Sequence, residues 1–154
     1  MAYHNTYDLP TIITNCSNNY GPRQYKEKLI PQTICNILDN KKIPVYGNGL
    51  QVRDWLYVKD HCAALTQVWK HGEVGEKYNI GGECEIRNID LVKKILKYMG
   101  RDESMIEYVK DRPGHDRRYS TDIRKIQNHI GWEPLYSLDY GLQQTIEWYE
   151  NHRN

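Results

Sequence analysis

A cluster of basic side chains lies between Asp111 and Arg118, where the sequence reads DRPGHDRR. Guanidinium groups are planar and bind phosphate oxygens two at a time, so three arginines close together favour an anion site. Pro113 fixes one backbone angle and Gly114 tolerates a positive φ, so we expect the basic side chains on a shaped loop. A solvated charged loop explains these residues equally well when they are considered alone.

The same loop contains His115 and Asp116, which raise the alternatives of a metal site or an acid–base pair. Either would need further groups at a suitable spacing, and no second set of ligands is found elsewhere in the chain. We therefore predict no metal site, and we expect Arg112 to contact phosphate instead.

Two asparagines, Asn18 and Asn19, follow the β-branched segment Thr11–Asn15, which is predicted to be a buried parallel strand. Ligands of open α/β sheets bind beyond the carboxyl ends of the strands, where two amides can read sugar hydroxyls or a nicotinamide. A cluster of turn formers over Ser17–Pro22 is the alternative, and the local sequence favours it.

A third candidate is Arg53, which is predicted to lie on a strand next to a strand that carries Pro44 and Tyr46, with a tight turn between them. A guanidinium beside an exposed tyrosine ring suits a nucleotide, with the ring against the base and the guanidinium against phosphate. A cross-strand arginine–aspartate pair beside a core Trp55 is an equally good interpretation.

The amphipathic periods predict one α/β unit without repeats or linkers. Asn88 is predicted to be the N-cap of its helix, and that helix N-terminus also offers N–H groups to an anion. A lone strand over 11–15 has no obvious parallel neighbour, so we expect the chain to be part of something larger. The predicted elements are helices over 1–7, 29–38, 58–71, 88–99, 122–130 and 138–153, and strands over 11–15, 44–46, 52–58, 77–80 and 106–109.

The composition narrows the possible partners. The 154 residues carry a net charge of +1, so broad attraction to nucleic acid or to a membrane is not indicated, and anion recognition must be local. No apolar run approaches a membrane span and no leader is visible, so a cytoplasmic location is expected. The four scattered cysteines lack a C-x-x-C pair, which indicates reduced thiols.

Several motifs of nucleotide enzymes are absent. The chain has no G-x-G-x-x-G, no Walker-type loop and no G-x-S-x-G. No tyrosine is followed four positions later by lysine, so the tyrosine–lysine pair of many nicotinamide enzymes is missing as well.

Seven motifs follow one another along the chain, namely TNCSNNYGP (14–22), EKLIP (27–31), PVYG-x-G (44–49), RDWLYV-x-DH (53–61), YNIGG (78–82), DRPGHDRRY (111–119) and GW-x-P (131–134). Taken in order, they resemble the motifs of the dTDP-glucose 4,6-dehydratases, a family of extended short-chain dehydrogenases/reductases. The EKLIP and DRPGHDRRY motifs are specific within the superfamily, whereas YNIGG and GW-x-P are shared more widely among nucleotide-sugar epimerases and dehydratases.

The resemblance implies an α/β fold that corresponds to the C-terminal, substrate-binding half of a Rossmann-like extended enzyme. Residues 1–22 would be a remnant of the NAD-binding Rossmann domain, and residues 23–154 would form the nucleotide-sugar-binding domain. The family's glycine-rich NAD loop, its dehydration residues and its tyrosine–lysine pair would lie upstream of Met1. We therefore expect this chain alone to be inactive and to bind NAD weakly or not at all.

By the same resemblance, Asn19 would contact the nicotinamide end of NAD, and Arg53 and Arg112 would hold the diphosphate of the substrate. Pro44 and Tyr46 would flank the nucleotide. The substrate contacts expected in full are Asn18, Lys28, Leu29, Pro44, Tyr46, Arg53, Asn88, Asp111, Arg112, Pro113, Gly114 and His115.

The activity that the resemblance implies is conversion of dTDP-glucose to dTDP-4-keto-6-deoxyglucose and water with NAD. Two alternatives stay open, namely a stand-alone module that binds nucleotide-diphosphate sugars and a part of a related UDP-sugar epimerase or decarboxylase. The family implies a homodimer. The chain itself is expected to self-associate, because the strand over 11–15 would leave an edge and an apolar face uncovered.

Overall fold

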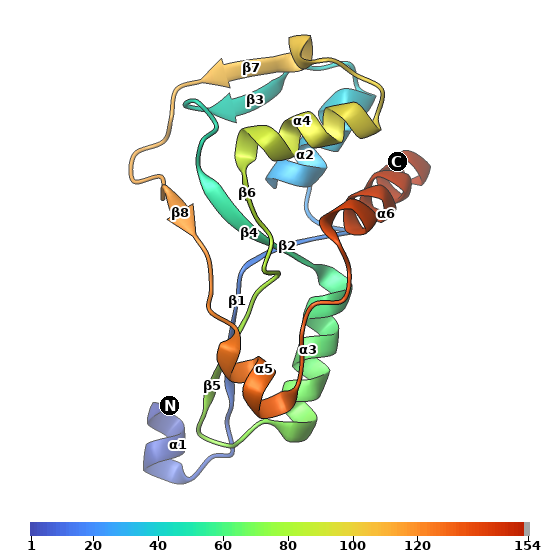
Figure 1. Ribbon diagram of the computed structural model, residues 1–154. Coiled ribbons are helices and arrows are strands. Elements are labelled where there is room, and N and C mark those ends of the chain that lie inside the picture. Colours follow the sequence, from blue (N-terminus) through green and yellow to red (C-terminus); the bar gives the residue numbers. More distant parts are fainter. Residues whose placement is uncertain (153–154) are drawn as a thin grey trace.

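The computed structural model describes residues 1–152, which form alternating helices and strands (Figure 1). The helices are α1 (Ala2–Tyr7), α2 (Leu29–Leu38), α3 (Val58–His71), α4 (Asn88–Tyr98), α5 (Arg124–Ile130) and α6 (Leu138–Asn151), with a 3₁₀ turn η1 (Glu103–Met105). The strands are β1 (Ile13–Cys16), β2 (Asn18–Tyr20), β3 (Ile43–Tyr46), β4 (Val52–Tyr57), β5 (Lys77–Ile80), β6 (Glu85–Arg87), β7 (Ile106–Val109) and β8 (Arg118–Tyr119).

Strand β4 runs between two hydrophobic clusters, one at each end of the molecule in Figure 1. The larger cluster fills the space among α2, α4 and α6, and the smaller one lies where α3 and α5 cover β5. Because successive strand residues point to opposite faces, Trp55 and Tyr57 join the larger cluster while Leu56 joins the smaller. The strand that carries Arg53 is therefore anchored on both faces.

The first predicted strand has a partner that the sequence did not suggest. β1 pairs in parallel with β5, in the register Ile13 to Lys77, so the expectation of a strand without a parallel neighbour was wrong. The expected burial was also wrong, because no residue of β1 is buried. The reason is that β5 is its only strand partner within residues 1–152, so one edge of β1 stays open there.

Asn18 and Asn19 lie on a strand, not in the turn that the local sequence favoured. Strand β2 pairs in parallel with β4, with Asn18 opposite Trp55 and Asn19 opposite Leu56. The following Tyr20 is only 1% exposed, because its ring packs edge-on against Trp55. This aromatic anchor overrides the turn preference of the asparagines.

Strands β3 and β4 do not form the expected hairpin. β3 pairs in parallel with β7, whereas β4 pairs with β2, β6 and β8. The turn between them has positive φ at Gly47 and Gly49, and a Cβ on Gly49 would lie 2.8 Å from the side chains of Val45 and Ile89. The close packing turns the chain from one sheet into another, so Tyr46 and Arg53 are not cross-strand neighbours.

The six helices were all predicted, with small differences at their ends. Asn88 is the first residue of α4 and not its N-cap; Arg87 holds the cap position, and no side chain caps the helix. The predicted end of the last helix at residue 153 lies outside the described residues, where α6 ends at Asn151. No helix in residues 1–152 has the length and apolar character needed to cross a bilayer.

Two buried carboxylates connect segments that are distant in sequence. Asp54 accepts hydrogen bonds from the N–H groups of Gly82 at 3.0 Å and Cys84 at 2.8 Å. Asp60 likewise accepts from Leu135 at 3.0 Å and Tyr136 at 3.1 Å. Asp54 therefore binds backbone and not an arginine, which removes the cross-strand arginine–aspartate pair as an interpretation of the RDW motif.

Candidate functional site

Arg53 is a buried cation without a carboxylate partner. Its side chain lies on β4 and the residue is 7% exposed. Its guanidinium donates to two backbone carbonyls, those of Val52 at 2.8 Å and Asp116 at 2.9 Å. No ion pair joins it to any carboxylate of residues 1–152. A buried charge without a direct ion pair is costly, so this position favours an anionic ligand.

Arg112 adds a second positive charge beside the first. Burial is the main cause that lowers the pKa of Arg53; Asp116 opposes this shift, and the nearby Arg112 guanidinium adds to it. The Arg112 side chain is exposed and forms no hydrogen bond or ion pair within the described part of the chain. The structure thus brings the two arginines, one from a strand and one from a loop, within electrostatic range of each other.

Asp111 organises the interior of the loop between β7 and β8. Its carboxylate accepts from His115 Nδ1 at 2.7 Å, from the Arg112 N–H at 2.9 Å and from Gln51 Nε2 at 2.9 Å. These bonds lower the pKa of Asp111, the hydrogen bond from His115 contributing most. The His115 ring packs edge-on to Tyr46, with ring centroids 6.5 Å apart.

Gln51 belongs to the site although its sequence pattern was not recognised as functional. It is 8% exposed, and its amide contacts Asp111 and the carbonyl of Tyr46. The available signal was a polar residue between Leu50 and Val52 where a strand begins, because a buried polar residue needs partners.

Asn88 offers an unused acceptor near the same residues. Its N–H donates to the Gln51 carbonyl oxygen at 2.9 Å, but its side-chain Oδ1 is buried and has no partner in residues 1–152. A buried polar atom without a hydrogen bond costs free energy, and a donor on a ligand would remove that cost. Pro44 and Tyr46 lie on β3, and Tyr46 is about half exposed, so part of its ring is accessible to a ligand.

The two asparagines of β2 point to opposite faces of the strand, because strand side chains alternate. Asn19 donates from Nδ2 to the Ser17 carbonyl at 3.1 Å, and its Oδ1 is buried without a partner among the described residues. The Asn18 side chain forms no hydrogen bond there, and its backbone lies opposite Trp55, two residues along β4 from Arg53. The alternation suits two different ligand groups.

Lys28 and Leu29 are not brought to the loop. Lys28 forms an exposed ion pair with Glu27 at 3.2 Å, and Leu29 packs against the larger hydrophobic cluster. Pro113 and Gly114 form the exposed tip of the loop; Gly114 has a φ of 69° and open space around it, so its backbone angle explains the glycine.

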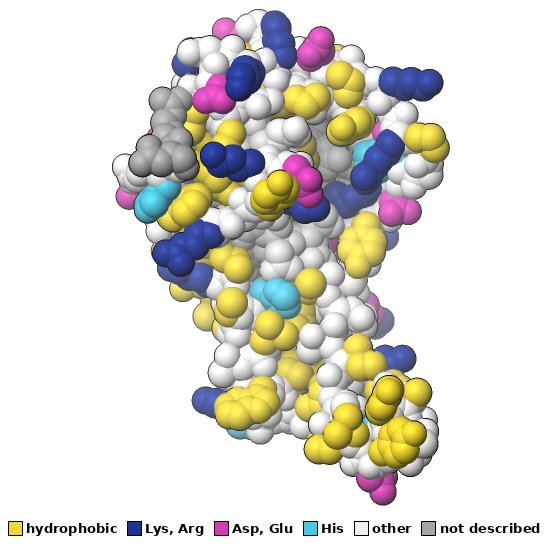
Figure 2. Space-filling model, turned by 180° about the vertical axis from the view of Figure 1, so that it is seen from behind, with side chains coloured by type: hydrophobic (Ala, Val, Ile, Leu, Met, Phe, Trp, Pro, Cys, Tyr) yellow, Lys and Arg dark blue, Asp and Glu magenta, His cyan; other side chains and the backbone are white. Residues whose placement is uncertain are grey.

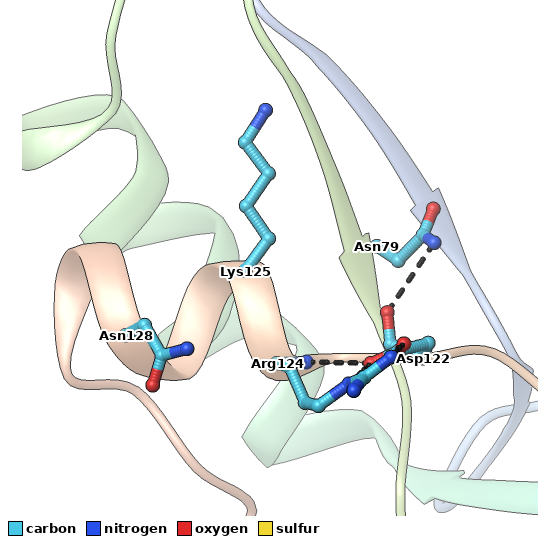
Figure 3. Close-up of a pocket in the computed structure, with 5 residues that line it drawn as sticks. All are labelled: Asn79, Asp122, Arg124, Lys125 and Asn128. Atoms are coloured by element: carbon cyan, nitrogen blue, oxygen red, sulfur yellow. Dashed lines mark hydrogen bonds and ion pairs between the residues drawn. The ribbon is translucent and has the colours of Figure 1, made fainter.

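The larger of two described pockets lies elsewhere. It has a volume of about 440 Å³, and Figure 3 shows its lining residues Asn79, Asp122, Arg124, Lys125 and Asn128. Its charges are already paired, since Arg124 Nε lies 2.9 Å from Asp122 Oδ2 and Lys125 pairs with Glu76. The second pocket, of about 160 Å³, lies beside α6. Neither pocket is lined by Arg53 or Arg112.

Comparisons with known proteins show the family and the fold of the chain. A family model described as GDP-mannose 4,6 dehydratase matches residues 1–145. A curated dTDP-glucose 4,6-dehydratase from Neisseria meningitidis is 52% identical over 159 residues, which covers 96% of this chain and 45% of the relative. The chain therefore spans about half the length of the curated relatives it matches.

Solved structures match over nearly the whole chain. The dTDP-glucose 4,6-dehydratase of Bacillus anthracis, in complex with NAD, superposes with a TM-score of 0.94 at 53% identity and covers 99% of this chain and 48% of its own. The enzyme of the same name from Streptomyces venezuelae, DesIV, gives a TM-score of 0.97 at 45% identity, covering 99% and 47%. The match is to the C-terminal portion of these structures, which confirms the predicted fold class.

The fold is shared beyond the dehydratases. The UDP-glucose 4-epimerase of Thermotoga maritima, solved with UDP-glucose, gives a TM-score of 0.93 at 27% identity, and covers 99% of this chain and 50% of that protein. The fold alone thus does not select one reaction.

Proposed function

We propose, from the premise that this chain belongs to the GDP-mannose 4,6-dehydratase family, that it is the nucleotide-sugar-binding part of an NAD-dependent dTDP-glucose 4,6-dehydratase. The observation that carries the proposal is the buried guanidinium of Arg53, which forms no ion pair with a carboxylate of residues 1–152 and lies within electrostatic range of Arg112. The reaction of the whole enzyme would convert dTDP-glucose to dTDP-4-keto-6-deoxyglucose and water.

Each part of the site would bind a different part of the ligand. Arg53 and Arg112 would hold the diphosphate, because guanidinium groups match pairs of phosphate oxygens. The exposed ring of Tyr46, 47% accessible, would stack on the base. The free Oδ1 of Asn88 would accept a hydrogen bond from a ligand donor. Asn18 and His115 would contact the sugar nucleotide as well.

One residue of the described chain, Asn19, could contact NAD. The buried Oδ1 of Asn19 has no partner, and the carboxamide N–H of a nicotinamide is a suitable donor for it. When bound, NAD supplies the acceptor for hydride from the sugar. The chain lacks the tyrosine–lysine pair and the glycine-rich loop, so we propose that it neither turns over substrate nor binds NAD strongly by itself.

We also propose two units in the chain, residues 1–22 as part of a Rossmann domain and residues 23–154 as the substrate-binding domain. Strand β5, from the second unit, pairs with β1 of the first, so the two units share a two-stranded sheet. The first unit would mediate self-association, because β1 has an open edge and α1 has no buried residue. Figure 2 shows exposed apolar side chains gathered over α1. Tyr3 and Tyr7 of this helix are 68% and 71% exposed.

We propose a cytoplasmic location from the arrangement of the cysteines. The four cysteines are scattered along the chain without a C-x-x-C pair, as expected for a protein that works in the reducing cytoplasm.

Calorimetric titration with dTDP tests the proposal. We expect micromolar binding that falls about tenfold in Arg112→Ala, because one charge-assisted contact is lost. Arg117→Ala, an exposed arginine of the same loop, is the matched control and should bind like the wild type. Absence of dTDP binding in the wild type would contradict the proposal.

Related measurements distinguish the two alternative functions. The epimerase fold match favours a test with UDP, and UDP binding as tight as dTDP binding would indicate a UDP-sugar enzyme. A stand-alone binding module would bind dTDP tightly, and adding NAD or the rest of a family enzyme would not produce the 4-keto product.

A further inference from the structure

Gln51 contacts three of the segments that form the candidate site. Its Nε2 donates to Asp111 Oδ2 at 2.9 Å and to the Tyr46 carbonyl oxygen at 3.4 Å. The main-chain carbonyl oxygen of Gln51 accepts a hydrogen bond from the main-chain N–H of Asn88 at 2.9 Å. One residue, 8% exposed, therefore joins the end of β3, the start of α4 and the loop between β7 and β8.

The contact with Asp111 continues to His115. The two carboxylate oxygens of Asp111 have different partners, because Oδ2 accepts from Gln51 while Oδ1 accepts from His115 Nδ1 at 2.7 Å. An ionised carboxylate can only accept, so the facing Nδ1 must carry the proton in the neutral ring. The His115 side chain is 7% exposed, and its Nε2 forms no hydrogen bond within residues 1–152. That Nε2 then keeps a lone pair for a ligand hydroxyl.

We propose that Gln51 is a positioning residue of the nucleotide-sugar site, whose amide holds Asp111 and thereby fixes the ring orientation and the Nδ1–H tautomer of His115. The inference rests on the proposed function, because it takes His115 as a ligand contact. The donor atom of Gln51 is the essential one. Nε2 donates to two acceptors, whereas Oε1 is buried and has no partner in the described chain.

Exchanging the hydrogen-bond donor and acceptor between positions 51 and 111 tests this role. Gln51→Glu places a second carboxylate against Asp111, and like charges at this distance repel, so we expect dTDP affinity to fall about tenfold. Combining it with Asp111→Asn restores a donor–acceptor pair in the reverse direction and should recover most of the affinity. A merely structural role predicts lower thermal stability without this specific rescue. Gln143→Glu, on the exposed face of α6, is the charge-matched control and should change nothing.

A second readout needs no ligand. Two-bond ¹⁵N–¹H NMR on the free 154-residue chain should show His115 as the Nδ1–H tautomer, a mixture in Gln51→Glu, and Nδ1–H again in the double variant. If Gln51→Glu does not fold, Gln51→Leu removes the donor without adding charge and should give a smaller shift in the same direction. An unchanged tautomer in both single variants would overturn the positioning role. The tautomer pattern without dTDP binding in the wild type would instead refute the proposed function while supporting the Gln51–Asp111–His115 chain.

Discussion

Two regions of this chain each hold a pair of cationic side chains, and they differ in how the charges are compensated. In the pocket beside α5, Arg124 and Lys125 pair with the carboxylates of Asp122 and Glu76. At the loop after β7, Arg53 and Arg112 have no carboxylate partner among the described residues, and Arg53 is buried. The cations of the larger hollow are thus paired within the chain, whereas Arg53 and Arg112 are not. We therefore expect the unpaired buried charge, and not the larger hollow, to mark the ligand site.

The strongest test of this contrast replaces Arg53 by methionine. We expect Arg53→Met to weaken dTDP binding about 100-fold, because both a charge and its hydrogen bonds to phosphate are lost. Thermal stability should fall by at most about 1 kcal/mol, since removing an uncompensated buried charge offsets the lost hydrogen bonds. The matched variant Arg124→Met should leave dTDP affinity unchanged by calorimetry. Equal losses in both variants would abolish the distinction between the two regions.

A smaller effect is expected from the aromatic contact. Tyr46→Ala removes the exposed ring beside His115, and stacking on a base contributes about 1–3 kcal/mol, so dTDP should bind about tenfold more weakly. Exposed Tyr108 on the neighbouring β7 provides the control, and Tyr108→Ala should bind as the wild type does. If both variants or neither lose affinity in the same titration, the ring of Tyr46 is not the nucleotide platform.

The ion pair between Asp122 and Arg124 should make the stability of the folded chain depend on pH in the acid range. Hydrogen bonds from Arg124 lower the pKa of Asp122 to about 2, below the value near 3.9 expected for the unfolded chain. Because the folded pKa is depressed, the stabilising contribution of Asp122 is present above about pH 4 and is lost as the pH falls toward 2. Urea unfolding of the wild type and Asp122→Asn should therefore differ slightly at pH 5 and converge near pH 2. Equal stability of the two proteins at pH 5 would mean that the pair contributes nothing, and an undiminished difference at pH 2 would mean that the ionised carboxylate is not its source.

Much of the fold could be predicted from local patterns. The helices follow from apolar periodicity and the strand after Gly75 from its alternation, and these need no knowledge of the partner segments. Strand pairing could not be predicted in this way. The turn at Gly47–Gly49 has the composition of a hairpin, but the packing of Gly49 against Ile89 sends β4 into another sheet. Likewise, Tyr20 makes a strand of an asparagine-rich segment through a contact 35 residues away, at Trp55.

In the candidate site too, the residue types could be read from the sequence, whereas their long-range contacts could not. The types of its arginines, tyrosine and asparagines allowed nucleotide binding beside other interpretations, and the family resemblance favoured it. Neither indicated that Asp54 binds the backbone of Gly82 and Cys84, leaving Arg53 unpaired, because that depends on long-range geometry. Gln51 was missed for the same reason, since its partners lie on three separate segments.

The central claim is that the loop site binds a diphosphate, and one titration tests it most directly. The wild-type chain should be titrated with dTDP and, in parallel, with thymidine, which has the base and sugar but no phosphate. Our account predicts that thymidine binds at least about 100-fold more weakly, since it offers nothing to Arg53 and Arg112. Equal affinity for the two ligands, or no binding of dTDP, would contradict it.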